Sequence, residues 1–361
     1  MRTDTIFSPI TLGAIELANR VVMSPMTRDR AGPADEPNAI MVEYYRQRAS
    51  AGLIVTEGTQ PTAEGKGYWR TPGIYTQQQI DGWAKVAEAV HAEGGKIVMQ
   101  LMHTGRVVVP ANRGYEADII APSALPCPAL VPGPDGTPVP TAMPRALAAD
   151  ELPMIAEQYA TAARNARTAG LDGVELHCSS GYLINQFLNP ASNKRDDEFG
   201  GDAQGRVRFP VMVAKAMADA IGADRVGIRI SPGNPYNGMD PIDAHDSFSA
   251  FLTALTEENS GHAFAYVHLA DIKLEDMDAP AFVRQHWTGP IILNNMLTLD
   301  TANQALTNHV AEAVSFGRPF LANPDLVERF REGAPLAKPD YSLLYQGEER
   351  GYIDYPPYQA A

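Results

Sequence analysis

The sequence has few cysteines, a deficit of basic residues and no long apolar run. Its 361 residues include only Cys127 and Cys178, too few for a disulfide framework, a four-cysteine zinc site or a cysteine-held iron–sulfur cluster. No apolar stretch approaches the roughly 18 residues that span a bilayer, and the first residues lack the apolar core of a secretory signal. Acidic residues outnumber basic ones by 43 to 29, and the net charge of −14 disfavours nucleic acid and anionic membranes as partners. We expect a cytoplasmic globular protein, either a monomer or a homodimer.

Short apolar runs alternate with helical patterns about eight times along the chain. The predicted strands are residues 20–24, 53–57, 96–101, 173–177, 226–231, 265–269, 291–294 and 313–316. Apolar residues at 3–4 spacing predict helices over 79–91 and 152–169, and Asp150 and Asp300 are expected to begin two helices. Eight buried parallel strands are most simply closed as a (β/α)8 TIM barrel, here a single domain over 1–361. An open doubly wound sheet is the alternative, but no GxGxxG follows an early strand.

Residues 104–149 interrupt this alternation. They hold nine prolines, so the segment cannot form a barrel helix. A Pro-Asp-Gly turn at 134–136, flanked by Leu130, Val131 and Val139, predicts a hairpin-like excursion. An insertion after the third strand falls on the catalytic face of a barrel, which favours a cap or lid over surface padding.

Chemically capable side chains lie where the predicted strands end. His177 and Tyr182 flank one strand-to-helix turn, where a histidine can bind an oxyanion and a tyrosine can deliver a proton. No neighbouring carboxylate or histidine completes a metal-ligand set, so no metal is expected. Adjacent strand residues face opposite sides, which disfavours Cys178 as a nucleophile if His177 faces the barrel mouth. Gly317 and Arg318 follow the eighth strand, where many barrels bind phosphate.

Six ordered motifs between residues 17 and 356 resemble the old yellow enzyme family of flavin-dependent ene-reductases, in the subgroup of pentaerythritol tetranitrate reductase and morphinone reductase. They are LANRVVMSPMTR at 17–28, QLMHTGR at 100–106, GYLINQFL at 181–188, SNKR at 192–195 leading to FGG at 199–201, FGRPFLANPDL at 316–326 and GYIDYP at 351–356. The resemblance implies a barrel that binds FMN non-covalently, is reduced by NADPH or NADH, and is reoxidised by an electron-poor alkene.

The resemblance also assigns roles to residues of this sequence. It places Pro25, Met26 and Thr27 against the flavin, Gly58 and Gln100 at its pyrimidine edge, Arg229 at its N1/O2 side, and Gly317 and Arg318 at its phosphate. His177 would bind the substrate carbonyl oxygen and Tyr182 would protonate Cα, while Tyr68 and Tyr345 would line the substrate cavity. The 104–149 segment corresponds to the capping excursion of the family.

Three positions depart from the family pattern. Ser180 stands where the family has a second histidine or an asparagine that shares the substrate oxygen, and its shorter side chain predicts an altered substrate preference. Met102 replaces a tryptophan that is common over the substrate, which predicts a roomier pocket. Asn295 replaces a phosphate-contacting glycine, although its amide could itself donate to phosphate.

The sequence therefore predicts an NAD(P)H-dependent FMN ene-reductase acting on small activated alkenes such as enones, enals, maleimides or nitroalkenes. Two alternatives stay open at this point. One is a member specialised for a single metabolite, including redox-neutral isomerisation. The other is a flavoprotein of low turnover that serves as a redox sensor. The redox sensor is disfavoured because the sequence keeps a full set of site residues, namely Thr27, Gln100, His177, Tyr182, Arg229 and Arg318.

Overall fold

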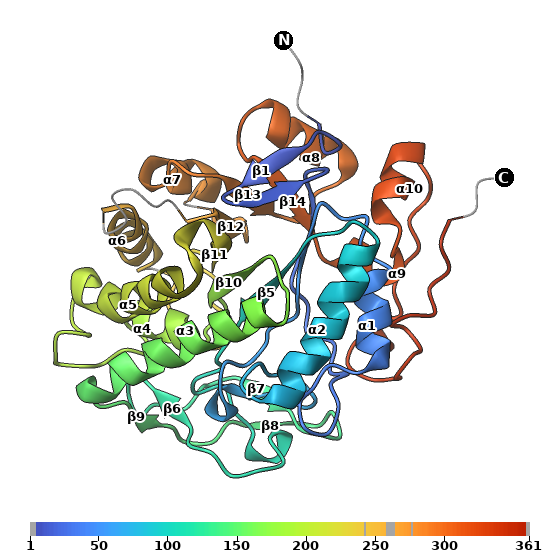
Figure 1. Cartoon of the computed structure of the whole chain (residues 1–361). Coiled ribbons are helices and arrows are strands. Elements are labelled where there is room, and N and C mark those ends of the chain that lie inside the picture. Colours follow the sequence, from blue (N-terminus) through green and yellow to red (C-terminus); the bar gives the residue numbers. More distant parts are fainter. Residues whose placement is uncertain (1–4, 242, 258–263, 276, 359–361) are drawn as a thin grey trace.

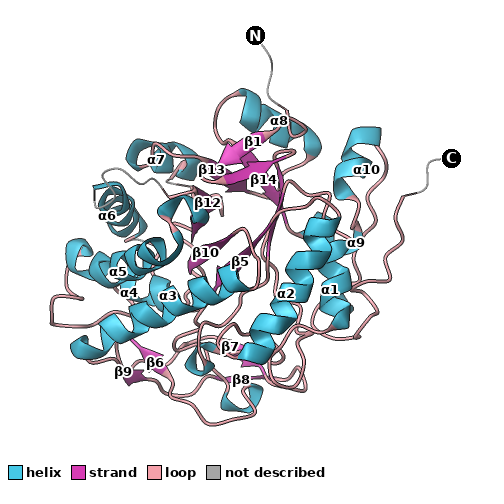
Figure 2. Cartoon of the chain, viewed as in Figure 1, coloured by secondary structure: helices cyan, strands magenta, loops and turns pink. Residues whose placement is uncertain are grey.

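The computed structural model describes residues 5–241, 243–257, 264–275 and 277–358, and contains a closed barrel of eight parallel strands surrounded by helices (Figures 1 and 2). The barrel strands are β3 (Val21–Met23), β4 (Leu53–Val55), β5 (Ile97–Leu101), β10 (Gly173–Cys178), β11 (Val226–Ile230), β12 (Tyr266–Ala270), β13 (Ile291–Asn294) and β14 (Ala313–Phe316). They pair in chain order, and β14 pairs with β3 to close the barrel. The predicted (β/α)8 fold is confirmed, as are all eight strand positions.

The strands are buried on both faces, which explains their continuous apolar sequences. The helices are α1 (Ala39–Arg46), α2 (Gln77–Ala92), α3 (Leu152–Thr168), α4 (Leu183–Leu188), α5 (Ala203–Ile221), α6 (Ala244–Glu257), α7 (Ala279–His286), α8 (Leu299–Thr307), α9 (Arg318–Ala322) and α10 (Leu326–Glu332). The predicted helices over 79–91 and 152–169 are α2 and α3. In α2, Trp83, Val86 and Val90 recur at helical spacing and are fully buried.

Both predicted helix starts are wrong by one or two residues. Asp150 lies inside a 3-10 turn, Ala149–Glu151, that leads into α3, and the side chain of Glu151 accepts a hydrogen bond from the backbone N–H of Ala148. The cap of α8 is Thr298, whose hydroxyl accepts from the N–H of Thr301, and Asp300 lies in the first turn. Both aspartates are near a helix start, but another residue one or two positions away begins the helix.

A short hairpin closes the amino-terminal end of the barrel. It consists of β1 (Ile10–Leu12) and β2 (Ile15–Leu17), joined through Gly13 with φ of +57°. Leu12, Ile15 and Leu17 pack in one cluster with barrel residues such as Val22 and Val98. This hairpin is not apparent from the sequence, because strands of three residues are too short to show a clear alternation.

The proline-rich segment lies at the opposite end of the barrel from this hairpin (Figure 1). It contains the predicted hairpin, formed by β7 (Leu130–Pro132) and β8 (Pro138–Pro140), and a second pair formed by β6 (Ile120–Ala121) and β9 (Arg145–Ala146). Val107, Val109, Cys127 and Val131 of this segment form a cluster that packs against Tyr68 and Tyr182. The segment therefore caps the carboxyl ends of the strands. None of the described helices is long and apolar enough to cross a membrane.

Candidate active site

His177 and Tyr182 lie beside each other at the carboxyl end of β10. His177 is the penultimate residue of the strand, and Tyr182 is the residue before the first turn of α4. Their ring centroids are 5.2 Å apart. The alternation of the strand places His177 inward with Glu175, whereas Cys178 belongs to the apolar core between the strands and the helices. The single turn predicted to join the histidine and the tyrosine therefore brings them together.

The imidazole of His177 is uncharged at neutral pH. Burial, reinforced by the positive charge of Arg229 on the next strand, lowers the pKa of His177 to about 3. Its Nδ1 is buried and has no hydrogen-bond partner among the residues that the structure describes. A neutral imidazole still has one N–H, so His177 can donate a hydrogen bond to an incoming oxygen. A buried nitrogen without a partner also indicates that a ligand or a water completes this site.

The hydroxyl of Tyr182 is hydrogen-bonded to that of Tyr68. The two oxygens are 3.0 Å apart, and the rings meet edge to face. Burial raises the pKa of Tyr182, and Tyr236 and Tyr345 nearby raise it further, so the hydroxyl keeps its proton. The cap covers both tyrosines through Cys127 and Val131. Tyr182 is thus a protonated acid in a partly buried position beneath the cap.

Ser180 occupies a strained backbone position next to this pair. Its φ is +59°, in the left-handed region that serine adopts less readily than asparagine. Its Oγ lies 3.3 Å from the Oγ of Ser179, and its carbonyl accepts a hydrogen bond of 2.8 Å from Asn237 Nδ2. The turn is therefore held by the loop that follows β11.

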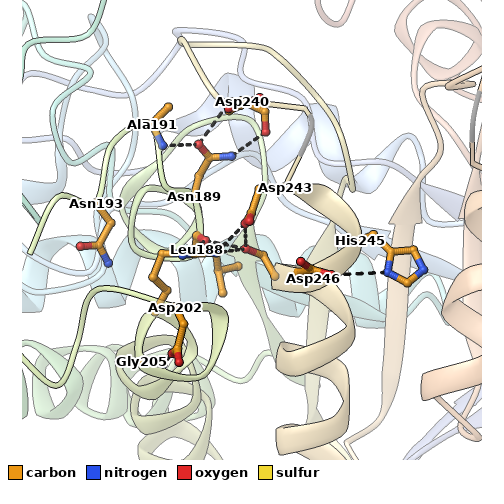
Figure 3. Close-up of polar contacts among 12 residues, drawn as sticks. Leu188, Asn189, Ala191, Asn193, Asp202, Gly205, Asp240, Asp243, His245 and Asp246 are labelled. Atoms are coloured by element: carbon orange, nitrogen blue, oxygen red, sulfur yellow. Dashed lines mark hydrogen bonds and ion pairs between the residues drawn. The ribbon is translucent and has the colours of Figure 1, made fainter.

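That loop is itself fixed to the end of α4. Asn189 donates through Nδ2 to the carbonyl of Asp240 at 2.9 Å and accepts through Oδ1 from the N–H of Asp240 at 3.0 Å (Figure 3). Arg206 donates to Asp243 at 2.6 Å and to the carbonyl of Leu188 at 2.9 Å. These contacts immobilise the backbone that holds Ser180.

The residues expected at the isoalloxazine and at the phosphate follow the first and the last strand of the barrel, which pair with each other. Pro25, Met26 and Thr27 follow β3, while Gly317 and Arg318 follow β14, its neighbour in the barrel. A methyl group added at Gly317 would lie 3.4 Å from the sulfur of Met26, so the two loops touch. The guanidinium of Arg318 is exposed and forms no ion pair with any described residue. An unpaired cation at this end of the barrel suits a phosphate.

Three more of the predicted residues lie within the barrel mouth. Gly58 lies against the side chain of Met102, because a methyl group added at Gly58 would be 2.6 Å from Met102 Cε. Gln100 donates to the buried carboxylate of Glu175 at 2.8 Å. The side chain of Met102 therefore lies directly against the Gly58 backbone.

Asn295 and Tyr345 lie at the rim. The amide of Asn295 donates to Asp271 at 2.9 Å, and Lys273 pairs with the same carboxylate at 2.9 Å. Asp271 therefore accepts one of the two N–H groups of the Asn295 amide, and the other is left for the predicted phosphate contact. Tyr345 is 57% exposed and belongs to a carboxyl-terminal segment that Arg28 and Arg30 hold through its backbone carbonyls.

Sequence reasoning missed several residues of this region. Glu175 and His268 form a buried hydrogen-bonded pair inside the barrel, and Tyr236 is on the loop over Tyr68 and Tyr182. Glu175 could have been found, because it is two residues before His177 and so shares its face of the strand. The relation of His268 to both depends on which strands are neighbours, and no local pattern reveals it.

Two other chemistries that the sequence disfavours are a thiol nucleophile at Cys178 and a metal site. The thiol of Cys178 is fully buried, and burial raises its pKa well above the ordinary value, so it is not the activated thiolate of a nucleophile. Among the described residues, no group of three or more histidine, cysteine, aspartate or glutamate side chains is arranged to hold a metal ion.

The residues present fit FMN. An unpaired arginine is exposed at the expected phosphate end, an amide and a guanidinium lie inside the barrel at Gln100 and Arg229, and a buried imidazole nitrogen of His177 lacks a partner among the described residues. A phosphate, a pyrimidine edge and a bound oxygen atom are the groups that such donors recognise.

Comparisons with known proteins agree with this arrangement. The profile of the NADH:flavin oxidoreductase / NADH oxidase family matches residues 5–337. A "Probable flavin mononucleotide-dependent alkene reductase" of Leishmania infantum is 40% identical, over 98% of this chain and 97% of its own length. The structure of an old yellow enzyme homologue from Zymomonas mobilis aligns with a TM-score of 0.93 and 38% identity, over 98% and 99% of the two chains. Morphinone reductase in complex with tetrahydroNAD aligns with a TM-score of 0.91 and 41% identity, over 98% of each chain.

Proposed function

The chain belongs to the old yellow enzyme family of NADH:flavin oxidoreductases, and from this we propose that it reduces small electron-poor alkenes such as enones, enals, maleimides and nitroalkenes. It is an NAD(P)H-dependent flavin oxidoreductase, and its cofactor is FMN. The observation that carries the proposal is the pair formed by His177 and Tyr182, whose rings are 5.2 Å apart at one strand end. One side chain can bind an oxygen and the other can deliver a proton.

FMN bound at this site would supply the hydride for Cβ of the alkene, with NADH or NADPH as its source. The neutral imidazole of His177 donates a hydrogen bond to the carbonyl or nitro oxygen of the substrate, which stabilises the negative charge that develops there. Tyr182 then gives its proton to Cα. Burial keeps the Tyr182 hydroxyl protonated until that step, because it raises its pKa.

The family membership also suggests which residues bind the cofactor and which line the substrate cavity. We assign FMN binding to Pro25, Met26, Thr27, Gly58, Gln100, Arg229, Asn295, Gly317 and Arg318. We assign the substrate cavity to Tyr68, Met102 and Tyr345. Arg229 places its positive charge where reduced flavin gathers negative charge, and Arg318 meets the phosphate.

Ser180 is proposed to shift substrate preference. A serine hydroxyl is shorter than an imidazole or a carboxamide, and here it lies 3.3 Å from the hydroxyl of Ser179. The second donor to the substrate oxygen is therefore weakened. Loss of one such donor costs roughly 100- to 1,000-fold in rate in a well-studied enzyme, so substrates that depend on two donors should be poor ones.

An anaerobic cycle tests the proposal. NADPH or NADH should bleach the absorbance of the FMN-loaded protein, and 2-cyclohexenone or N-methylmaleimide should restore it with formation of the saturated product. A flavin that is reduced quickly but is reoxidised by none of the four alkene classes would contradict the proposal. That outcome would favour a redox sensor.

A further inference from the structure

A fully buried carboxylate lies at the centre of a polar network inside the barrel. The side chain of Glu175 has no exposed area. Its Oε1 accepts from Gln100 Nε2 at 2.8 Å, and its Oε2 is 2.8 Å from His268 Nδ1 and 3.2 Å from the hydroxyl of Tyr266. These three partners come from β5 and β12, the strands on either side of the pair β10 and β11. The carboxylate therefore links side chains across the barrel interior.

The same network reaches Arg229. Arg229 is the register partner of both His177 and His268 on the neighbouring strands. Its Nη1 is 2.8 Å from Nε2 and 3.0 Å from Nδ1 of His268, so the guanidinium lies against the imidazole. The other side of that ring is fixed by Ser315, whose Oγ is 2.8 Å from Nε2. His268 is thus a rigid spacer between Glu175 and Arg229.

The network contains two opposite charges. Burial opposes ionisation of Glu175, but His268, Arg229 and Gln100 together outweigh it and hold the pKa of the carboxyl below its ordinary value. Burial and the charge of Arg229 lower the pKa of His268, and the opposing effect of the Glu175 carboxylate does not reverse that shift, so the neutral form of the imidazole is favoured. At neutral pH a carboxylate therefore lies behind the guanidinium of Arg229 and offsets part of its charge.

We infer that Glu175 is a positioning residue that sets the reduction potential of the bound flavin. It holds the amide of Gln100 directly and the guanidinium of Arg229 through His268, and its negative charge weakens the field that Arg229 exerts on the cofactor. The inference rests on the proposed function, in which Gln100 and Arg229 contact FMN. Because reduced flavin has more negative charge near N1, removal of the carboxylate charge favours the reduced form.

The test is the potential of FMN-loaded Glu175→Gln, measured by anaerobic dye equilibration beside the wild-type protein. The carboxamide has nearly the same volume and can accept from Gln100, so the main change is the charge. At a fixed solution potential we expect the ratio of reduced to oxidised flavin to rise about tenfold. This corresponds to an increase of about 30 mV in the reduction potential of a two-electron couple. We also expect FMN to bind several-fold more weakly, because Gln100 loses a charged acceptor.

Tyr266→Phe is the matched control, since it removes one hydrogen bond to the same carboxylate and leaves the charge in place. Its potential should stay within a factor of two of the wild-type ratio. Equal potentials in wild type and Glu175→Gln overturn the inference, and so does an equal shift in Tyr266→Phe.

A second variant covers the case in which Glu175→Gln does not fold. His268→Asn keeps the carboxylate but removes the spacer, so Arg229 can approach Glu175 and the reduced-to-oxidised ratio should fall severalfold. An unchanged ratio again overturns the inference. Failure of the proposed function has a different signature, because it appears in the wild-type protein as no retained FMN or no reoxidation by alkenes.

Discussion

The hydroxyl oxygens of Tyr68 and Tyr182 are 3.0 Å apart, and their rings meet at 85° with centroids 6.2 Å apart. The two residues are 114 positions apart in the sequence. Tyr68 follows a 3-10 turn after β4, and Tyr182 directly precedes α4. This contact gives the proposed acid a fixed orientation, because one of its lone pairs or its proton is already directed at Tyr68. Replacing each tyrosine by phenylalanine in turn can show which of the two supplies the proton.

Tyr182→Phe should slow reduction of 2-cyclohexenone by about 100-fold or more, as expected when a general acid is removed. Flavin reduction by NADPH needs no such proton and should change little. Stopped-flow absorbance separates the two half-reactions. An equal loss in both would rule out Tyr182 as the proton donor.

Tyr68→Phe should have a smaller effect on the same step. It removes one hydrogen bond, worth about 0.5–1.5 kcal/mol, so the rate of alkene reduction should fall by about 2- to 12-fold. Tyr75→Phe is the control, because Tyr75 forms a similar hydroxyl pair with Tyr115, 3.3 Å apart, on the surface. A Tyr68→Phe enzyme as slow as Tyr182→Phe would contradict this minor role, because it would mean that proton transfer needs both hydroxyls.

Ser180→Asn should tighten binding of a simple phenol by about fivefold, the equivalent of one net hydrogen bond near 1 kcal/mol. Asparagine also suits the φ of +59° at this position better than serine does. The phenol is titrated into the oxidised holoprotein, and its long-wavelength charge-transfer band is followed. Ser180→Ala is the matched variant. If neither substitution changes the affinity, Ser180 does not face the substrate oxygen.

Stability should depend on pH through Asp29, which lies two residues after the segment 25–27 that is expected to contact the flavin. Burial, followed by the charge of Glu57, raises the pKa of Asp29 from 3.8 to about 8, against the opposing charges of Arg30 and Arg70. The folded protein therefore keeps a proton that the unfolded chain releases near pH 4. Its free energy of unfolding should fall as pH rises between about 4 and 8.

Asp29→Asn should weaken this dependence and stabilise the holoprotein by about 1–3 kcal/mol at pH 9 relative to pH 4.5. A smaller dependence of the same sign should persist, because burial also raises the pKa of Glu57 to about 7. Urea unfolding at the two pH values measures the difference, with Glu16→Gln on the exposed face of β2 as the control. The same pH slope in wild type and Asp29→Asn would show that the carboxyl of Asp29 is ionised in the folded state.

The barrel was predictable from the sequence because each strand is a short, continuous apolar run between recognisable helices. The runs at 291–294 and 313–316 coincide with β13 and β14 to the residue. Burial on both faces leaves this trace in the local sequence wherever a parallel sheet is covered by helices. His177 and Tyr182 were predictable for a related reason, since one short turn joins them and chain connectivity alone keeps them close.

The tertiary structure alone decided which distant side chains meet. Glu175 on β10 pairs with His268 on β12 because both side chains point into the barrel interior. Tyr68 contacts Tyr182 beneath the cap. It likewise decided that the amide of Asn295 binds Asp271 and that Ser180 has a left-handed backbone. Hydrophobic periodicity is a property of neighbouring residues along the chain, so it determines the elements. Hydrogen bonds and charge compensation depend on distances in space, which are set only when the barrel closes.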